Sequence, residues 1–155
     1  MPNLIARYTH WLHTQWPAGG VEKGPRVRED GRCNLKGVRM VGDLTGVPLL
    51  KFSADSGARA VAALLQESDF KPGAGGAAGV HDLVIIGAGV AGMSAAIEAQ
   101  RAGLSYVLYE GDESFATIHN FPRKKPIYTY PSEMRNAGQL YFNAEVKEAL
   151  PEVLK

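Results

Sequence analysis

The stretch HDLVIIGAGVAGMSAAIEAQRAGLSYVLYE, residues 81–110, decides the fold of this chain. It opens with an apolar run, Leu83–Ile86, whose β-branched residues predict a strand buried on both faces. A glycine turn and a helical pattern follow, and Gly103 ends the helix. A second apolar run, Tyr106–Tyr109, leads directly to Glu110. This order of strand, glycine turn, helix, strand and acid is what makes a GxGxxG motif specific.

The small residues of the glycine turn each have a physical reason to be there. Gly87 allows the tight turn out of the strand, and Gly89 lets the backbone approach a pyrophosphate without an intervening Cβ. Gly92 lets the helix lie close to the strands, while the N–H groups of its first turn face the phosphates. Glu110 is expected to accept hydrogen bonds from ribose hydroxyls. The predicted cofactor-binding residues of this unit are Gly87, Ala88, Gly89, Val90, Ala91, Gly92 and Glu110.

The spacing beyond the turn resembles that of a known group of enzymes. Gly92 is followed by three residues, then Ala96, then six residues and Gly103. This is similar to the FAD-binding start of the pyridine nucleotide–disulfide oxidoreductase and thioredoxin-reductase-like flavoproteins. The resemblance implies an α/β fold, a Rossmann-like FAD-binding βαβ unit with a parallel sheet. It also implies FAD as the cofactor and NAD(P)H as the electron donor of the parent enzyme.

Composition narrows the class of protein further. The 155 residues amount to about one domain, and 45% hydrophobic with 21% charged residues indicates a soluble, globular chain. A net charge of +1 argues against a nucleic-acid partner, and the single cysteine excludes an internal disulfide and a CxxC redox pair. The sequence has no apolar run of transmembrane length and no signal-peptide pattern, so a cytoplasmic location is predicted.

Residues 4–16 carry apolar side chains at helical spacing, and Pro17 ends the pattern. The predicted helix has one apolar, aromatic face formed by Leu4, Ile5, Tyr8, Trp11, Leu12 and Trp16. We expect this face to pack on the body of the protein, with a partner or a membrane surface as the alternatives. His10 and His13 fall off this face and are interpreted as solvated side chains, because no further metal ligands stand at a recognisable spacing.

The segment from residue 21 to residue 66 predicts a small β-hairpin, a strand and a helix. Asp30-Gly31 is a hairpin signal, and Val38–Asp43 reads as a short strand that ends in Gly-Asp. Pro48 suits the first turn of a helix, which we expect to extend to Gln66. The side chains expected to be buried on this helix are Leu49, Leu50, Val61, Leu64 and Leu65.

The run EDGRCNLKGVRMVGDLTG in this segment resembles the second FAD motif of the same flavoproteins. In that family the Gly-Asp aspartate binds the ribityl chain of the flavin, and the next helix points its N-terminus at the isoalloxazine ring. The resemblance assigns these roles to Asp43, with Gly42 for the close backbone approach, and places Lys51 near the flavin to stabilise negative charge. Cys33 is interpreted as a strand residue and not as a redox thiol.

The two motifs stand in reversed order, because in the family the Gly-Asp motif closes the FAD domain after the nicotinamide-binding domain. The chain is either a fusion of one flavoprotein's tail to another's head, or a circular permutation in which residues 21–66 complete the FAD domain in cis. The permutation predicts that Val38–Val41 joins the sheet beside Leu83–Ile86. The glycine- and alanine-rich stretch 71–80 is a predicted linker between residues 1–70 and a truncated FAD-binding domain, residues 81–155.

Downstream of Glu110, Asn120-Phe121-Pro122 resembles the thioredoxin-reductase-like loop that passes the flavin. The resemblance implies that Asn120 and Thr117 contact the cofactor, and an ordinary turn is the alternative. The basic residues Arg123–Lys125 are interpreted as a solvated loop and not as a 2′-phosphate site. A final helix is predicted over Tyr141–Lys155, with Asn143 as its N-cap.

These patterns favour the FAD-binding portion of a NAD(P)H-dependent flavoprotein oxidoreductase, in which hydride passes from nicotinamide to flavin and on to an unidentified acceptor. The expected partners are FAD, the remaining reductase domains or an electron acceptor, and a second copy in a homodimer. No residue is assigned as catalytic and no metal site is expected. The alternatives are a non-catalytic dinucleotide-binding or interaction module, and a Rossmann unit that binds NAD instead of FAD.

Overall fold

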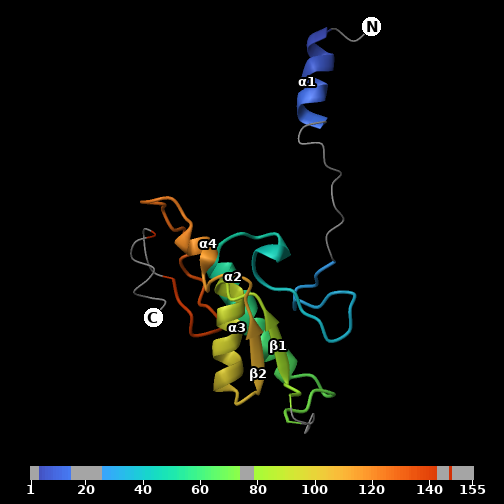
Figure 1. Cartoon of the computed structure of the whole chain (residues 1–155), viewed down its shortest axis with the longest axis vertical. Helices are drawn as coiled ribbons and strands as arrows, with labels where there is room; N and C mark the ends of the chain where they lie inside the picture. The colour runs from blue at the N-terminus through green and yellow to red at the C-terminus, as the bar shows by residue number, and fades with distance from the viewer. Residues whose placement is uncertain (1–3, 15–25, 74–78, 143–146, 148–155) are drawn as a thin grey trace.

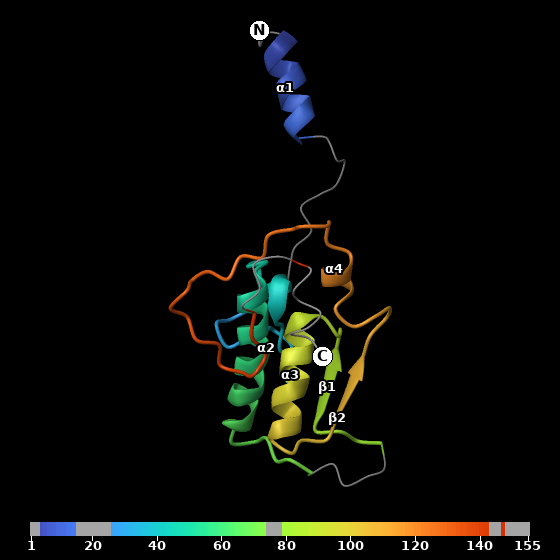
Figure 2. The same ribbon diagram turned by 90° about the vertical axis from the view of Figure 1, so that its left-hand side faces the viewer.

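The computed structural model describes residues 4–14, 26–73, 79–142 and 147. In chain order they form α1 (Leu4–Thr14), the 3-10 helix η1 (Gly42–Thr45), α2 (Leu50–Leu65), β1 (Leu83–Ile86), α3 (Val90–Arg101), β2 (Tyr106–Tyr109) and α4 (Ala116–His119). Helix α3 contacts α2 on one side and both strands on the other, so the body is layered as helix, helix and sheet (Figures 1 and 2).

The strands β1 and β2 form a parallel pair in which Leu83 lies opposite Tyr106 and Ile86 opposite Tyr109. The predicted parallel pairing is therefore confirmed. Helix α3 connects the two strands and ends as its sequence predicts. Gly103 adopts a left-handed conformation with φ +70°, its N–H donates to Gln100 O at 3.0 Å, and the N–H of Leu104 donates to Ala99 O at 3.0 Å. This pair of hydrogen bonds is a Schellman motif.

Among the described residues, the sheet is covered on one face only. Ile85 faces α3 and is 7% exposed, whereas its neighbours Val84 and Ile86 are 54% and 87% exposed. The prediction of a strand buried on both faces is therefore wrong for the described chain. Successive side chains of a strand point to opposite faces, and α3 covers just one of them.

Two apolar clusters hold the layers together. Small side chains let α3 approach the sheet closely, in a cluster of Val61, Ile85, Ala95, Ala96, Ala99 and Leu104. The second cluster lies near the C-terminal ends of the strands and consists of Ala54, Val90, Phe115, Ile118, Ile127, Leu140 and Phe142. Helices α2 and α3 also touch through backbone, because a Cβ added at Gly57 would overlap the carbonyl oxygen of Ala91. The predicted burial of Val61 is confirmed, while Leu65 is 44% exposed.

The segment before α2 forms less sheet than its sequence predicts. The Asp30-Gly31 turn is present, but the predicted hairpin is reduced to one antiparallel bridge between Arg32 and Arg39. The prediction that Val38–Val41 joins the sheet is wrong, since the described sheet holds only β1 and β2. The circular permutation that required this pairing is therefore not borne out. Side-chain contacts hold this segment elsewhere: the Arg39 guanidinium pairs with Glu67 beyond α2 and donates to Asp30 O at 2.6 Å.

Helix α1 forms close to its predicted bounds, but its apolar face does not pack on the body. Leu4 and Ile5 are 82% and 72% exposed, and α1 lies apart from the other elements in both views (Figures 1 and 2). Within the described ranges, no helix combines the length and the apolarity needed to cross a membrane. Most of the predicted final helix, including Asn143, and linker residues 74–78 lie outside the described residues.

Candidate functional site

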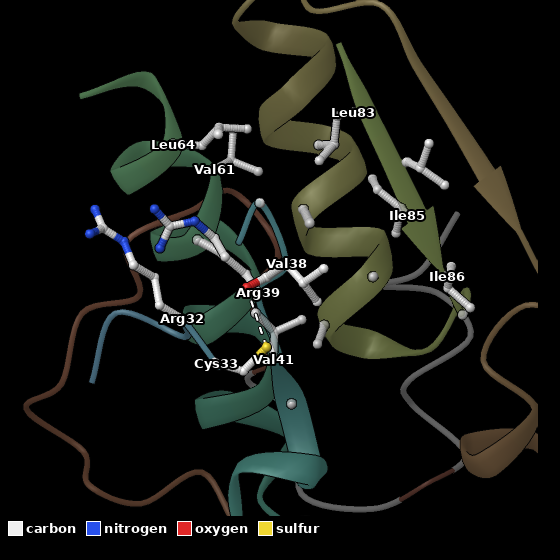
Figure 3. A pocket seen from close by; sticks show the side chains of 18 of the residues that line it. Arg32, Cys33, Val38, Arg39, Val41, Val61, Leu64, Leu83, Ile85 and Ile86 are labelled. Carbon is white, nitrogen blue, oxygen red and sulfur yellow. Dashed lines mark hydrogen bonds between the residues drawn. The ribbon is translucent and has the colours of Figure 1, made fainter. Parts of the chain in front are cut away.

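A cleft of about 1290 Å³ lies between the segment before α2 and strand β1. Figure 3 shows Val38 and Val41 on one wall and Leu83, Ile85 and Ile86 on the other. The cleft reaches the glycine turn at the start of α3. Eight of the predicted cofactor-binding residues line it: Gly42, Asp43, Gly87, Gly89, Val90, Ala91, Gly92 and Thr117. Tertiary structure thus brings together two motifs that are separate in the chain.

The glycine turn leaves room for a ligand at one position and for none at another. A Cβ added at Gly92 would overlap the carbonyl oxygen of Gly87, so this glycine is needed for the contact between helix and turn. A Cβ added at Gly89 meets no heavy atom within 4 Å, so the space in front of it is open. The N–H groups of Val90, Ala91 and Gly92 belong to the first turn of α3. No helical carbonyl precedes this turn, so these N–H groups have no acceptor within the helix. Open space beside unpaired N–H groups suits a phosphate.

Glu110 lies at the carboxyl end of β2, next to the glycine turn. Its Oε2 accepts from Ala88 N–H at 2.5 Å, and its Oε1 accepts from Gly111 and Asp112 N–H at 2.7 and 3.1 Å. The N–H of Ala88, followed by those of Asp112 and Gly111, holds the pKa of Glu110 below its ordinary value. A carboxylate has about four acceptor positions, so three backbone donors leave one for a ribose hydroxyl.

Two serines of α2 hold the Gly42-Asp43 turn. Ser53 is 3% exposed and donates from its Oγ to Asp43 Oδ1 at 2.6 Å. Ser56 accepts from Gly42 N–H at 2.8 Å and donates to Ser53 O at 2.9 Å. Gly42 has φ +75°, and a Cβ added there would lie 2.9 Å from Ala91 Cβ. The turn is thereby pressed against the first turn of α3, and Asp43 keeps one oxygen, Oδ2, for another donor.

Four predicted site residues do not line this cleft: Ala88, Glu110, Lys51 and Asn120. Ala88 and Glu110 adjoin it at the glycine turn. The ammonium of Lys51 donates to Thr129 O at 3.3 Å and to Pro131 O at 2.5 Å, so it ties α2 to the loop after α4. Asn120 is exposed at the C-terminal end of α4, and its N–H donates to Ala116 O at 2.9 Å. The structure brings Thr117 to the cleft but neither Lys51 nor Asn120.

The edge of β1 that borders the cleft is open. Leu83 N–H and Gly87 N–H donate toward β2, to Ser105 O at 3.2 Å and to Tyr109 O at 2.7 Å. Backbone groups alternate along a strand, so the N–H and C=O groups of Val84 and Ile86 face the other edge. The antiparallel bridge of Arg32 and Arg39 stands across the cleft from this edge. Within the described ranges β1 thus has a single strand partner.

Sequence reasoning missed several residues that shape this site. The sequence pattern predicts Ser53, Ser56 and Gly57 only as part of a helix, although small and hydroxyl residues close together on one helix are a signal of close packing. Phe115 likewise has no site role predicted from the sequence. It is buried, lines the cleft and donates its N–H to Ala88 O at 3.0 Å, which closes the cleft beside the glycine turn.

The arrangement suits a dinucleotide. It offers N–H donors for a pyrophosphate, an acid beside the glycine turn for a ribose, and a second acid, Asp43, in the cleft itself. Among the residues that the structure describes, no cluster of three His, Cys, Asp or Glu side chains is placed to hold a metal ion. The N–H donors and the two acids fit binding of an organic cofactor.

Comparison with known proteins agrees with this fit. Residues 82–120, which hold β1, α3, β2 and α4, match the family model of the FAD binding domain. Comparison with curated proteins and with solved structures finds no match. The two-stranded parallel sheet with its helices is compatible with part of an α/β FAD-binding fold. The family match thus supports an FAD-binding flavoprotein with FAD as its cofactor.

Proposed function

We propose that this chain is the FAD-binding portion of a NAD(P)H-dependent flavoprotein oxidoreductase of the thioredoxin-reductase-like group. The observation that carries the proposal is the packing of the Gly42-Asp43 turn against the first turn of α3. A Rossmann unit for NAD needs the glycine turn and Glu110 alone. An acid held along the same cleft, beyond the phosphate position, favours the longer flavin dinucleotide.

The proposal gives each part of the site a binding role. The N–H groups of Val90–Gly92 hold the pyrophosphate with the positive end of the α3 dipole. Glu110 holds the adenosine ribose, and Asp43, oriented by Ser53, holds a ribityl hydroxyl through Oδ2. Thr117 lies on the same cleft and contacts the cofactor from the α4 side. Lys51 and Asn120 stay predictions from the family resemblance.

Bound flavin supplies hydride and electron transfer, and the protein supplies binding and orientation. The nicotinamide site and the electron acceptor belong, in this proposal, to other domains of a cytoplasmic reductase or to a partner. Helices η1 and α2, which contact each other and α3, contribute to the proposed site through Asp43 and Ser53. They do so without adding a strand to β1.

The test begins with the protein purified in the presence of FAD. We expect yellow protein with the absorption bands of oxidised flavin, and titration of the apoprotein should show tighter binding of FAD than of NAD. We expect little or no reduction of the bound flavin by NADH or NADPH, because no second GxGxxG motif stands in this sequence. Preference for NAD would contradict the flavin assignment, and rapid reduction would contradict the assignment of the nicotinamide site to another domain.

A substitution at Gly89 separates binding from folding. Gly89→Val places a side chain in the open space before the helix, where the added Cβ meets no heavy atom within 4 Å and φ is −73°. We expect this variant to fold with unchanged circular dichroism and to lose FAD. The matched control is Ser132→Val on the exposed loop after α4, away from the cleft, which should keep FAD. Retention of FAD by Gly89→Val would contradict the assignment of the site.

A further inference from the structure

Helix α1 divides cleanly into two faces. At 3.6 residues per turn, Leu4, Tyr8 and Trp11 lie in line, with Ile5 and Leu12 beside them. Arg7 and Thr9 fall on the remaining side of the helix. The rings of Tyr8 and Trp11 are stacked, with their centroids 6.0 Å apart and their planes at 29°. The result is one continuous apolar and aromatic surface.

This surface is exposed to solvent in the described chain. The exposed members are Leu4, Ile5, Tyr8, Trp11 and Leu12, at 82%, 72%, 60%, 49% and 44%. An apolar face this large on one short helix signals a site of interaction. On the body of the chain, the exposed side chains Val84 and Ile86 of β1 lie in the cleft that the proposed cofactor site uses.

The charge of this region indicates which surface it meets. Residues 1–21 contain one formally charged side chain, Arg7, and no aspartate or glutamate. Such a segment is attracted to a negatively charged surface and has no acid to be repelled by it. Tyrosine and tryptophan rings, apolar with one polar tip, sit preferentially at the depth of lipid headgroups. We propose that α1 binds the surface of an anionic lipid bilayer through its Leu4–Leu12 apolar face.

The geometry of the helix agrees with surface binding. Its 11 residues are too few to cross a bilayer, which takes about 20 in a helix. A helix that lies in the plane of the interface buries its apolar face among the acyl chains and keeps its polar face in water. In this position α1 holds the FAD-binding body beside the membrane without inserting it.

The experiment uses the full chain with bound FAD and two kinds of vesicle. One kind is phosphatidylcholine alone, and the other is an equal mixture of phosphatidylcholine and phosphatidylglycerol. We expect the protein to sediment with the anionic vesicles, and this sedimentation should weaken as salt is raised. In a Trp16→Phe background Trp11 is the remaining tryptophan, and its emission should shift to the blue when anionic vesicles are added.

Matched variants on the two faces test the mode of binding. Leu12→Gln should weaken sedimentation about tenfold or more, since it removes one leucine from the buried face. Arg7→Gln should weaken it about fivefold, the effect of one cation near an anionic surface. The control Ala6→Gln adds the same amide to the polar face and should leave binding unchanged.

Three outcomes would overturn the proposal. The first is absence of wild-type binding to anionic vesicles, and the second is equal binding to neutral vesicles. The third is a dimer in solution that Leu12→Gln dissociates and Ala6→Gln does not, because that would assign the apolar face to a second copy. Circular dichroism of each variant shows whether the body has stayed folded. Flavin absorbance of the same samples reports separately on the cofactor site.

Discussion

At the scale of single residues, Asp43 illustrates how one side chain is prepared for a ligand. It is exposed, yet one carboxylate oxygen is held by Ser53, whose hydroxyl is buried in α2. A carboxylate that is oriented before binding loses less side-chain freedom when the ligand arrives. The serine is therefore a positioning residue for the proposed ribityl contact.

Ser53→Ala should weaken FAD binding about tenfold, equivalent to ~1.4 kcal/mol for one hydrogen bond to a charged group. Titration of the apoprotein with FAD measures the dissociation constant. Ser53→Thr keeps the hydroxyl and should restore part of the affinity, while Ser132→Ala on the exposed loop should have no effect. An unchanged dissociation constant in Ser53→Ala would show that Asp43 does not need this orientation.

Glu110 makes the stability contributed by its contact with the glycine turn depend on pH. The N–H of Ala88, followed by those of Asp112 and Gly111, lowers its pKa in the folded state below the ordinary value of 4.5. A group with a lowered folded pKa stabilises the fold fully above its unfolded pKa and loses this effect as pH falls through the folded pKa. Wild type should therefore exceed Glu110→Gln in stability near neutral pH, and the difference should shrink below about pH 4.5.

Urea unfolding of both proteins across this pH range measures the difference. Asp30 and Asp82 also have lowered pKa values, through N–H donors of Arg32 and of Gly73 and Ser105, but both proteins share them and their effects cancel. Glu133→Gln on an exposed loop serves as the control. A difference that persists unchanged into strong acid would mean that the carboxylate charge of Glu110 plays no part.

At the scale of elements, the crossing of α2 and α3 decides how the two cofactor motifs meet. Small residues permit it: Gly57 faces the backbone of Ala91, and the buried hydroxyl of Ser94 donates to Ala54 O at 2.6 Å. The segment before α2 reaches the same site by side-chain contacts instead of sheet pairing. Packing of α2 against α3 thus brings the two cofactor motifs together, whereas the sequence predicts that strand pairing does so.

Gly57→Ala tests this crossing. In an exposed helix interior the substitution would stabilise by up to ~1 kcal/mol. Here the new Cβ would overlap a backbone oxygen, so we expect a loss of about 1–3 kcal/mol in the free energy of unfolding, together with weaker FAD binding. Urea unfolding checks the sign, and Gly111→Ala, with open space around its added Cβ, is the control. A stabilised Gly57→Ala would refute the close crossing.

At the scale of the whole molecule, the described part of the body has one covered sheet face and one open face. Ile85 and Ile86 are neighbours in β1 with the same side chain, but they lie 7% and 87% exposed. A two-stranded sheet is marginal by itself, so α3 and the cluster beneath it supply most of the stabilisation of this layer.

Substitution of the two isoleucines measures this asymmetry. Ile85→Ala should cost about 2–5 kcal/mol of unfolding free energy, because it leaves a cavity under α3. Ile86→Ala should cost less than about 1 kcal/mol, the effect of strand propensity at an exposed site. Chemical unfolding of the purified chain gives both values. Equal losses would indicate that another surface covers Ile86 in solution.

The sequence alone determined the β1–α3–β2 unit and the kind of ligand it suits. These are local properties, since the glycine turn, the Gly103 cap and the position of Glu110 at a strand end depend on neighbours in the chain. The tertiary structure alone decided that Gly42-Asp43 meets α3 through Ser53, Ser56 and Gly57, and that Val38–Val41 stays outside the sheet. It also decided that α1 stands apart with its apolar face exposed. The physical reason is that long-range packing depends on which surfaces fit, and a periodic pattern records that a face is apolar but not what covers it.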